Sequence, residues 1–239
     1  GFMFWPQQIG GHKYFGHNAL MTNTIPMHDY QTDFIRLALE HEVLRFGSFT
    51  LKSGRISPYF FNLGQISSGA AMRTLSRAYA QTIINSGIAC DMLFGPAYKG
   101  IPLVAATACA LADSGRDLPY AYNRKEAKDH GEGGTLVGAA PKGRVIIVDD
   151  VLTAGTAMRE AIHLLRQAGA EPVAAVVALD RQERGPAGIS AVDALQQETG
   201  VQVRAMVRVQ DVMVFLESDL SRRDTLQSMR DYQKQYGVE

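Results

Sequence analysis

The sequence VIIVDDVLTAGT, residues 145–156, decides the fold of this chain. It begins with four consecutive apolar residues, and an unbroken run of this kind is typical of a strand that is buried on both faces of a sheet. Two adjacent carboxylates, Asp149 and Asp150, follow the run, and small and hydroxyl-bearing residues lead from them into a helical pattern over residues 157–168. A strand, a short loop and a helix in this order predict one unit of a parallel α/β sheet.

The same alternation recurs on both sides of this stretch. Apolar runs predict further strands over residues 92–94, 120–122, 173–179 and 201–207. Amphipathic segments predict further helices over residues 68–85, 100–112 and 221–236. Near the start, apolar residues between 34 and 44 predict an opening helix that Gly47 stops, and residues 49–51 and 59–63 predict two short strands. The predicted fold is therefore α/β, with a central, mostly parallel sheet flanked by helices.

The composition narrows the class of protein. A chain of 239 residues that is 46% hydrophobic is long enough to bury one full core. Its 24 Lys and Arg residues equal its 24 Asp and Glu residues, so it lacks the overall basic field that non-specific nucleic-acid binding needs. The longest apolar candidate, residues 101–112, is too short to span a membrane. We therefore expect neither nucleic acid nor a membrane as a partner.

The cysteines and the first residues bear on location and domain organisation. Cys90 and Cys109 form no CxxC pair and have no histidine at ligand spacing, which argues against a disulfide framework or a zinc site and favours the cytoplasm. Residues 1–26 scatter aromatic side chains without a helical or strand period, and they lack the pattern of a signal peptide. We expect a leader or added extension without ordered structure over residues 1–26 and a single domain over residues 27–239.

The loop that follows residues 145–148 combines two kinds of chemistry. Unpaired backbone N–H groups at a helix start, with the hydroxyls of Thr153 and Thr156, can hold a phosphate dianion. Asp149 and Asp150 would repel that phosphate, so they are expected to face hydroxyls or a hydrated divalent cation. A phosphorylated sugar that carries a diphosphate would satisfy both halves. The alternative is that the same residues merely cap the helix.

A second motif is the basic segment RKEAKDHGEGG, residues 124–134. It places three permanent cations and a histidine beside glycines, which predicts a mobile loop rather than a strand or a helix. Such a loop can close over a diphosphate, and Lys128 and His130 would then meet the charge that develops on the leaving group. The alternative is a solvated charged turn.

Together these motifs resemble a known family. The apolar strand, Asp149-Asp150 and the TAGT turn resemble the signature for phosphoribosyl diphosphate (PRPP) of the type I phosphoribosyltransferases. The basic segment is similar to the catalytic loop of the orotate phosphoribosyltransferases, and residues 49–61 and 95–102 resemble their substrate segment and diphosphate loop. The resemblance runs from residue 27 to the C-terminus. It implies the type I phosphoribosyltransferase fold, with a small N-terminal hood or cap and a flexible catalytic loop.

The resemblance also implies a reaction and its site. The reaction transfers ribose 5-phosphate from PRPP to orotate, giving orotidine 5′-phosphate and diphosphate in UMP biosynthesis. The residues implied to bind PRPP are Lys52, Tyr98, Lys99, Arg124, Lys125, Lys128, His130, Asp149, Asp150, Val151, Leu152, Thr153, Ala154, Gly155, Thr156 and Ala157. Those implied to bind orotate are Lys52, Phe60, Phe61, Thr153 and Arg181, and the catalytic set is Lys128, His130, Asp149 and Asp150.

The resemblance further implies Mg²⁺ as the cofactor and a homodimer. Mg²⁺ would be held mainly through PRPP, without a direct protein ligand, and a contact through water is the expectation for Asp149 and Asp150. Arg124 and Lys125 would serve the active site of the facing subunit.

Several alternatives stay open at the level of sequence. Phe60 and Phe61 could belong to the core, Tyr98 could merely pack, and Arg181 could be a surface charge. A PRPP-sensing regulator without transfer chemistry is a second function, although the neutral charge and the lack of a helix-turn-helix extension count against it. A purine-specific transferase of the same fold is a third, and a panel of acceptor bases separates it from the first.

Overall fold

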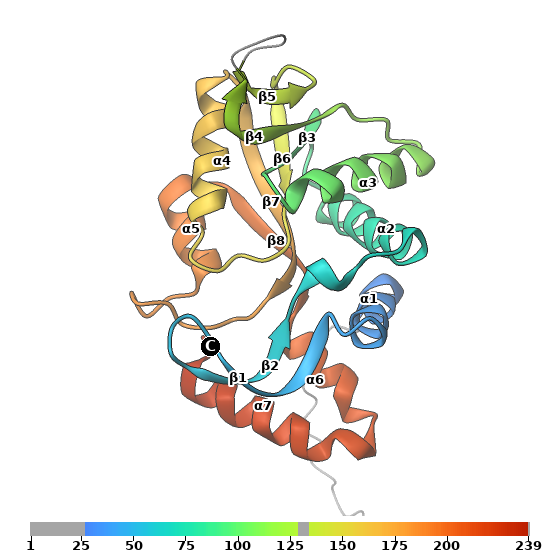
Figure 1. The fold of residues 1–239 in the computed structure, drawn as a ribbon, viewed down its shortest axis with the longest axis vertical. Helices are drawn as coiled ribbons and strands as arrows, with labels where there is room; N and C mark the ends of the chain where they lie inside the picture. The colour runs from blue at the N-terminus through green and yellow to red at the C-terminus, as the bar shows by residue number, and fades with distance from the viewer. Residues whose placement is uncertain (1–26, 129–133, 239) are drawn as a thin grey trace, which may run out of the picture.

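The computed structural model describes residues 27–128 and 134–238, so the leader predicted over residues 1–26 lies outside the described residues. Six strands form the main sheet: β3 (Met92–Gly95), β4 (Tyr120–Lys128), β5 (Gly134–Gly138), β6 (Arg144–Val148), β7 (Glu171–Asp180) and β8 (Gln202–Arg208). Their order is β5-β4-β3-β6-β7-β8 (Figure 1), and all neighbours are parallel except β4 and β5. The predicted α/β fold with a mostly parallel sheet is confirmed.

Helices cover both faces of this sheet. They are α1 (Asp29–Glu40), α2 (Gly69–Ser86), α3 (Gly100–Asp113), α4 (Thr156–Gln167), α5 (Ala191–Thr199), α6 (Val209–Glu217) and α7 (Arg223–Tyr236). In Figure 1, α1, α2 and α3 lie to one side of the sheet, and α4 and α5 lie to the other. Two short 3-10 helices, η1 (Leu63–Gln65) and η2 (Leu220–Arg222), complete the helical elements of the described residues.

Strand β6 shows why residues 145–148 are all apolar. Ile146 and Val148 belong to the buried cluster that contains α2 and α3, whereas Val145 and Ile147 belong to the cluster that contains α4 and α5. Because successive side chains of a strand point to opposite faces, a central strand covered on both faces must be apolar throughout. The four side chains are fully buried, as the sequence predicts.

A separate hairpin, β1 (Leu44–Thr50) and β2 (Ile56–Phe61), follows α1. The strands were expected later in the chain, and the prediction that the opening helix extends through Val43 and Leu44 is wrong. The helix ends at Glu40, Glu42 has a positive φ of 54°, and Leu44 pairs with Phe61 in the hairpin. Val43 and Leu44 are buried, so their apolar character serves the core and not a helical face.

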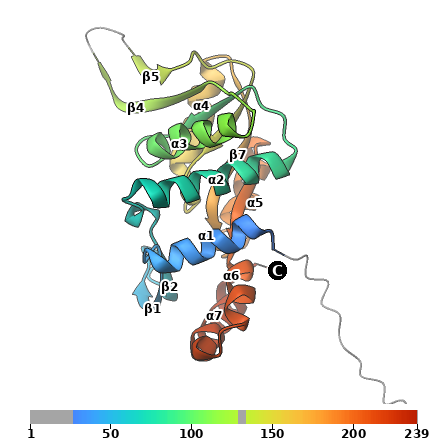
Figure 2. The same cartoon turned by 90° about the vertical axis from the view of Figure 1, so that its right-hand side faces the viewer.

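The basic segment also differs from its prediction. Residues 124–128 are not a loop, because they continue strand β4, and Lys128 pairs with Gly134 at the start of the antiparallel strand β5. Residues 129–133, including His130, lie outside the described residues. Figure 2 shows that this β4–β5 arm and the β1–β2 hairpin project from the same side of the molecule.

Two further helices and one strand were not predicted: α5, α6 and β5. Each is short, at nine, nine and five residues respectively, and none carries a long apolar period. In the described ranges, no helix is both long and apolar enough to cross a membrane.

Candidate active site

The loop after β6 is anchored at its start by neighbouring elements. The Asp149 N–H donates to the carbonyl of Val176 in β7, and the Tyr79 hydroxyl of α2 donates to the Asp149 carbonyl at 2.8 Å. The Ala178 N–H donates to the Asp150 carbonyl at 2.8 Å. These bonds hold the main chain at the carboxyl end of β6, so the two carboxylates leave the sheet from a rigid base.

The two carboxylates differ in their surroundings. Burial raises the pKa of Asp149 to about 7, and the negative charge of Asp150 adds to this effect. Asp150 is itself buried, but its Oδ2 accepts from Lys99 Nζ at 2.5 Å. Lys99 follows β3, so this ion pair joins the loops that follow two neighbouring strands. The protein therefore holds one paired carboxylate and one carboxylate that is easily protonated at neutral pH.

The rest of the loop is a turn of main chain that opens into α4. The residue that precedes the helix is Gly155, with a φ of 77°, and no side chain caps the first turn. Capping by the aspartates or threonines is therefore not observed, and the N–H groups at this helix start stay available to an anion. Arg159 links the loop to α5, because its Nη1 donates to the Ala154 carbonyl at 2.7 Å and its Nε donates to Glu198 of α5 at 2.7 Å.

The loop after β3, residues 96–99, is fixed by β4. The Ala97 N–H donates to Asn123 Oδ1 at 2.9 Å, and Lys125 Nζ lies 4.9 Å from the centre of the Tyr98 ring. Tyr98 is 65% exposed, an unusual state for a large aromatic side chain. Asn123 and Arg159 were not singled out from the sequence, because neither lies in a motif.

The predicted lid residues are only partly described. Lys125 contacts the Tyr98 ring, and Lys128 is the last residue of β4, whereas His130 lies outside the described residues. The Nη1 atom of Arg124 is buried and has no hydrogen-bond partner among the described residues. A buried guanidinium nitrogen without a partner is costly, and a bound anion would satisfy it.

The residues predicted to bind a base lie around the β1–β2 hairpin. Phe61 meets Phe34 of α1 edge-on at 6.4 Å and packs against the core, whereas Phe60 stacks on Phe49 at 5.5 Å. As neighbours on one strand they point to opposite faces. Lys52, in the turn of the hairpin, is exposed.

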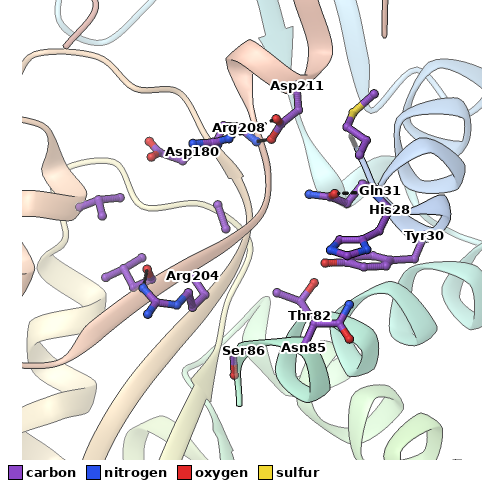
Figure 3. Close-up of a pocket in the computed structure, with 14 residues that line it drawn as sticks. His28, Tyr30, Gln31, Thr82, Asn85, Ser86, Asp180, Arg204, Arg208 and Asp211 are labelled. Atoms are coloured by element: carbon purple, nitrogen blue, oxygen red, sulfur yellow. Dashed lines mark hydrogen bonds and ion pairs between the residues drawn. The ribbon is translucent and has the colours of Figure 1, made fainter. Parts of the chain in front are cut away.

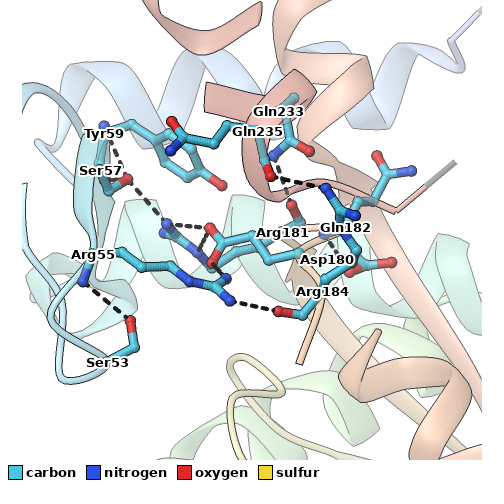
Figure 4. A network of polar contacts seen from close by, with 11 residues as sticks. Ser53, Arg55, Ser57, Tyr59, Asp180, Arg181, Gln182, Arg184, Gln233 and Gln235 are labelled. Atoms are coloured by element: carbon cyan, nitrogen blue, oxygen red, sulfur yellow. Dashed lines mark hydrogen bonds and ion pairs between the residues drawn. The ribbon is translucent and has the colours of Figure 1, made fainter. Parts of the chain in front are cut away.

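Arg181 follows β7 and reaches the same hairpin (Figure 4). Its Nη2 donates to Ser57 Oγ at 3.0 Å, its Nε donates to Glu183 Oε1 at 2.8 Å, and its guanidinium lies 4.2 Å from the centre of the Tyr59 ring. The side chain is only 16% exposed. Arg181 is therefore not a surface charge.

Comparison with known proteins identifies the family. The model of the phosphoribosyl transferase domain matches residues 62–204. The orotate phosphoribosyltransferase of Saccharophagus degradans is 56% identical over 214 residues, which cover 89% of this chain and all of the relative. The chain belongs to the orotate phosphoribosyltransferases. The enzyme of that name from Cellvibrio japonicus is 54% identical over 214 residues, again 89% of this chain and all of the relative. The crystal structure of the Francisella tularensis orotate phosphoribosyltransferase has a TM-score of 0.78 at 42% identity, over 86% of this chain and 99% of that one.

Membership in the orotate phosphoribosyltransferases, which are pentosyltransferases, agrees with the resemblance of the motifs. The fold of the family is the one described above. The family model covers the loops after β3, β6 and β7 but not the β1–β2 hairpin, which precedes residue 62.

A pocket of about 500 Å³ lies elsewhere on this phosphoribosyltransferase, between α1, α2 and the edge strand β8 (Figure 3). His28 stacks on Tyr30 at its wall, and Gln31 donates to the Met206 carbonyl at 2.8 Å. None of the predicted site residues lines it, although Asp180, the neighbour of Arg181, does. This pocket is therefore not where the motifs converge.

Proposed function

We propose that the loops after β3, β6 and β7, the β1–β2 hairpin and the β4–β5 arm form one active site for transfer of ribose 5-phosphate from PRPP to orotate. The products are orotidine 5′-phosphate and diphosphate, and the reaction is a step of UMP biosynthesis. The observation that carries the proposal is the ion pair between Lys99 and Asp150. It joins the diphosphate loop to the PRPP loop, the two motifs that the family needs at one place.

The 5-phosphate end of PRPP would lie on residues 151–157. The uncapped N–H groups at the start of α4 and the hydroxyls of Thr153 and Thr156 are suited to a phosphate dianion. Asp149 and Asp150 would then face the ribose hydroxyls. A carboxylate that burial and a like charge make hard to ionise gains from such donors, and this fits Asp149.

The diphosphate end would meet Lys52, Tyr98 and Lys99, with Arg124, Lys125, Lys128 and His130 contributed by the β4–β5 arm. These cations would stabilise the charge that grows on the departing diphosphate. Orotate would lie between the hairpin and the loop after β7, in contact with Lys52, Phe60, Phe61, Thr153 and Arg181.

Mg²⁺ is the cofactor that this chemistry implies. The ion would be held mainly by the phosphates of PRPP. Asp149 and Asp150 supply hard oxygen ligands and would hold its water shell. When bound, the ion neutralises the diphosphate charge.

The side chains of the protein would not have to supply a strong base or a nucleophile. Displacement at the anomeric carbon needs alignment of orotate with PRPP, and orotate is already an anion at neutral pH, so no strong base and no covalent enzyme intermediate are required. Positioning and stabilisation of the leaving group are the larger contributions.

The direct test is consumption of orotate, followed by its ultraviolet absorbance, with purified protein, PRPP and Mg²⁺. Adenine and hypoxanthine are offered in parallel, and EDTA is the control for the metal. Turnover of orotate alone, lost with EDTA, supports the function and the cofactor together. Binding of PRPP without turnover of any base would point to a regulator, and turnover of a purine would point to the third alternative.

A homodimer that shares the β4–β5 arms across its interface is also proposed. It is supported by the projection of the arm away from the body of the sheet (Figure 2). Mixing inactive Lys128→Ala and Asp150→Asn proteins tests it. If arms are shared, half of the dimers are mixed and one of their two sites is intact, so about a quarter of the activity returns. No recovery in a mixture shown to exchange subunits would contradict sharing.

The domain organisation and the location of the protein form part of this proposal. Residues 27–239 would form one domain, since the hairpin, the sheet and α7 share one buried cluster. A cytoplasmic location is supported by two free cysteines, one of them buried.

A further inference from the structure

The contacts of Arg181 hold its guanidinium in one orientation. Glu183 accepts from Nε, Ser57 Oγ accepts from Nη2, and the Tyr59 ring covers one face of the group. In the described part of the chain, Nη1 is the one nitrogen of this guanidinium without a protein partner. Because these contacts fix the guanidinium, Nη1 has a defined direction in which it can donate a hydrogen bond to a ligand.

Glu183 contacts a second arginine as well. Its Oε2 lies 3.7 Å from Nη1 of Arg55, which comes from the turn of the β1–β2 hairpin. The Arg55 Nη2 donates to the Arg184 carbonyl at 2.9 Å, and its guanidinium lies 4.8 Å from the centre of the Tyr236 ring of α7. One carboxylate that is 15% exposed therefore stands between two cations that come from distant parts of the chain.

The main chain on both sides of Glu183 is fixed too. The Arg184 N–H donates to the Tyr236 carbonyl at 2.7 Å, and the Val238 N–H donates to the Gln182 carbonyl at 2.8 Å. Gln233 of α7 donates to the Arg181 carbonyl at 3.0 Å. Figure 4 shows the side chains of this network converging from the hairpin, the loop after β7 and α7. The carboxylate thus has a rigid support and can orient what it binds.

We infer that Glu183 is a positioning residue for the acceptor base: it holds Arg181 so that Nη1 donates to orotate. The inference rests on the proposed function, in which Arg181 contacts orotate. Glu183 is shared between the guanidinium groups of Arg181 and Arg55, so it only partly offsets their positive charge, which suits an anionic pyrimidine.

The charge-neutral variant Glu183→Gln separates positioning from charge. If Glu183 orients Arg181, the variant weakens one charge-assisted hydrogen bond and removes the ion pairs to Arg181 and Arg55, so KM for orotate rises roughly tenfold while KM for PRPP stays within about twofold. If Glu183 only balanced charge, its neutralisation would favour the anion, and KM for orotate would fall. A purely structural role would raise both KM values together. Either of the last two results overturns the inference.

Glu217→Gln is the matched control. Glu217 Oε1 forms an ion pair of 2.6 Å with Arg230 Nη2 between α6 and α7, and the pair is about half exposed. The same substitution there neutralises a carboxylate that is paired with an arginine of α7, and it leaves Arg181 untouched. Both KM values are expected to stay at the level of the unmodified protein.

Arg181→Ala distinguishes failure of the inference from failure of the proposed function. A normal KM for orotate in Arg181→Ala would show that the proposed orotate contact is wrong, and the inference would fall with it. A raised KM in Arg181→Ala with a normal KM in Glu183→Gln would overturn the positioning role alone. In the double variant, Glu183→Gln should add nothing to the effect of Arg181→Ala, since it acts through that side chain. Multiplied effects would contradict the inference.

Discussion

The loops after β6 and β7 leave neighbouring parallel strands at the same edge of the sheet, yet they are built in opposite ways. The loop after β6 is continuous, and its predicted binding groups are main-chain N–H groups, small residues and two adjacent carboxylates. The loop after β7 depends on side chains, and its partners come from the β1–β2 hairpin and from α7, over a hundred positions away for Ser57. A site made of backbone groups can be recognised from one contiguous motif, whereas a site made of side chains depends on contacts between distant parts of the chain.

The largest effect is expected from a substitution that restricts the backbone of the loop after β6. Gly155→Val places a β-branched residue at a φ of 77°, which such residues avoid, so the turn must rearrange. We expect kcat/KM for PRPP to fall by about 10²-fold, since the misplaced groups position the reacting substrate. Steady-state kinetics measure it, and KM for orotate should change far less.

Gly169→Val is the control at the other end of α4. Gly169 has a φ of 85° and open space around its Cβ position, so the strain is similar but lies away from the loop. It should lower Tm without an effect on PRPP. Equal kinetic losses in both variants would mean that stability of α4, and not the loop, is what the kinetics report.

The β4–β5 arm is the second test, because Lys128 would act on the diphosphate of the PRPP molecule whose 5-phosphate the loop after β6 would hold. Lys128→Ala should lower kcat by at least roughly 10²-fold, by analogy with loss of one preorganised donor. Turnover within a few-fold of the unmodified protein would remove Lys128 from the catalytic set. Lys142→Ala, at an exposed position before β6, is the control for loss of a positive charge.

A third prediction concerns Asp149, a carboxylate of the loop after β6, through which the free energy of unfolding depends on pH. Its pKa is raised from 3.8 to about 7 in the folded protein, so the folded state binds the proton more tightly than the unfolded state does. Its contribution to stability is therefore complete below about pH 4 and is lost as the pH rises through about 7. Asp149→Asn should gain on the order of 2 kcal/mol over the unmodified protein between pH 5 and pH 8.

Thermal unfolding of both proteins at the two pH values measures this gain. Asp91→Asn is the control, because Arg144 lowers the pKa of Asp91 to about 2 and its charge does not change in that range. A constant difference in Tm between Asp149→Asn and the unmodified protein would contradict the raised pKa.

The smallest effect is expected for substitution of Asn123, which accepts a hydrogen bond from the loop after β3. Asn123→Ala removes the acceptor for the Ala97 N–H, and one neutral hydrogen bond of about 1 kcal/mol corresponds to roughly a fivefold rise in KM for PRPP. Asn123→Asp keeps an oxygen at that position and should recover part of the loss. No difference between the two variants would show that the bond does not order the loop.

The contrast between the two loops also explains how far sequence reasoning reached. The strand–loop–helix unit around β6 was predictable because residues 145–148 are all apolar and the loop that follows them is contiguous. Asn123, Arg159 and Glu183 were not found, because their importance lies in partners that only the folded chain brings near. The error at Val43 and Leu44 has a similar origin, since a short apolar spacing fits a helix and a buried strand equally well.

The pairing of the last described residues with the loop after β7 has a practical consequence for labelling. Val238 is hydrogen-bonded to Gln182, so whatever is joined after it leaves the molecule beside the predicted base-binding end. An environment-sensitive fluorophore placed there would report occupancy of that end directly, while a bulky affinity tag at the same point would obstruct it.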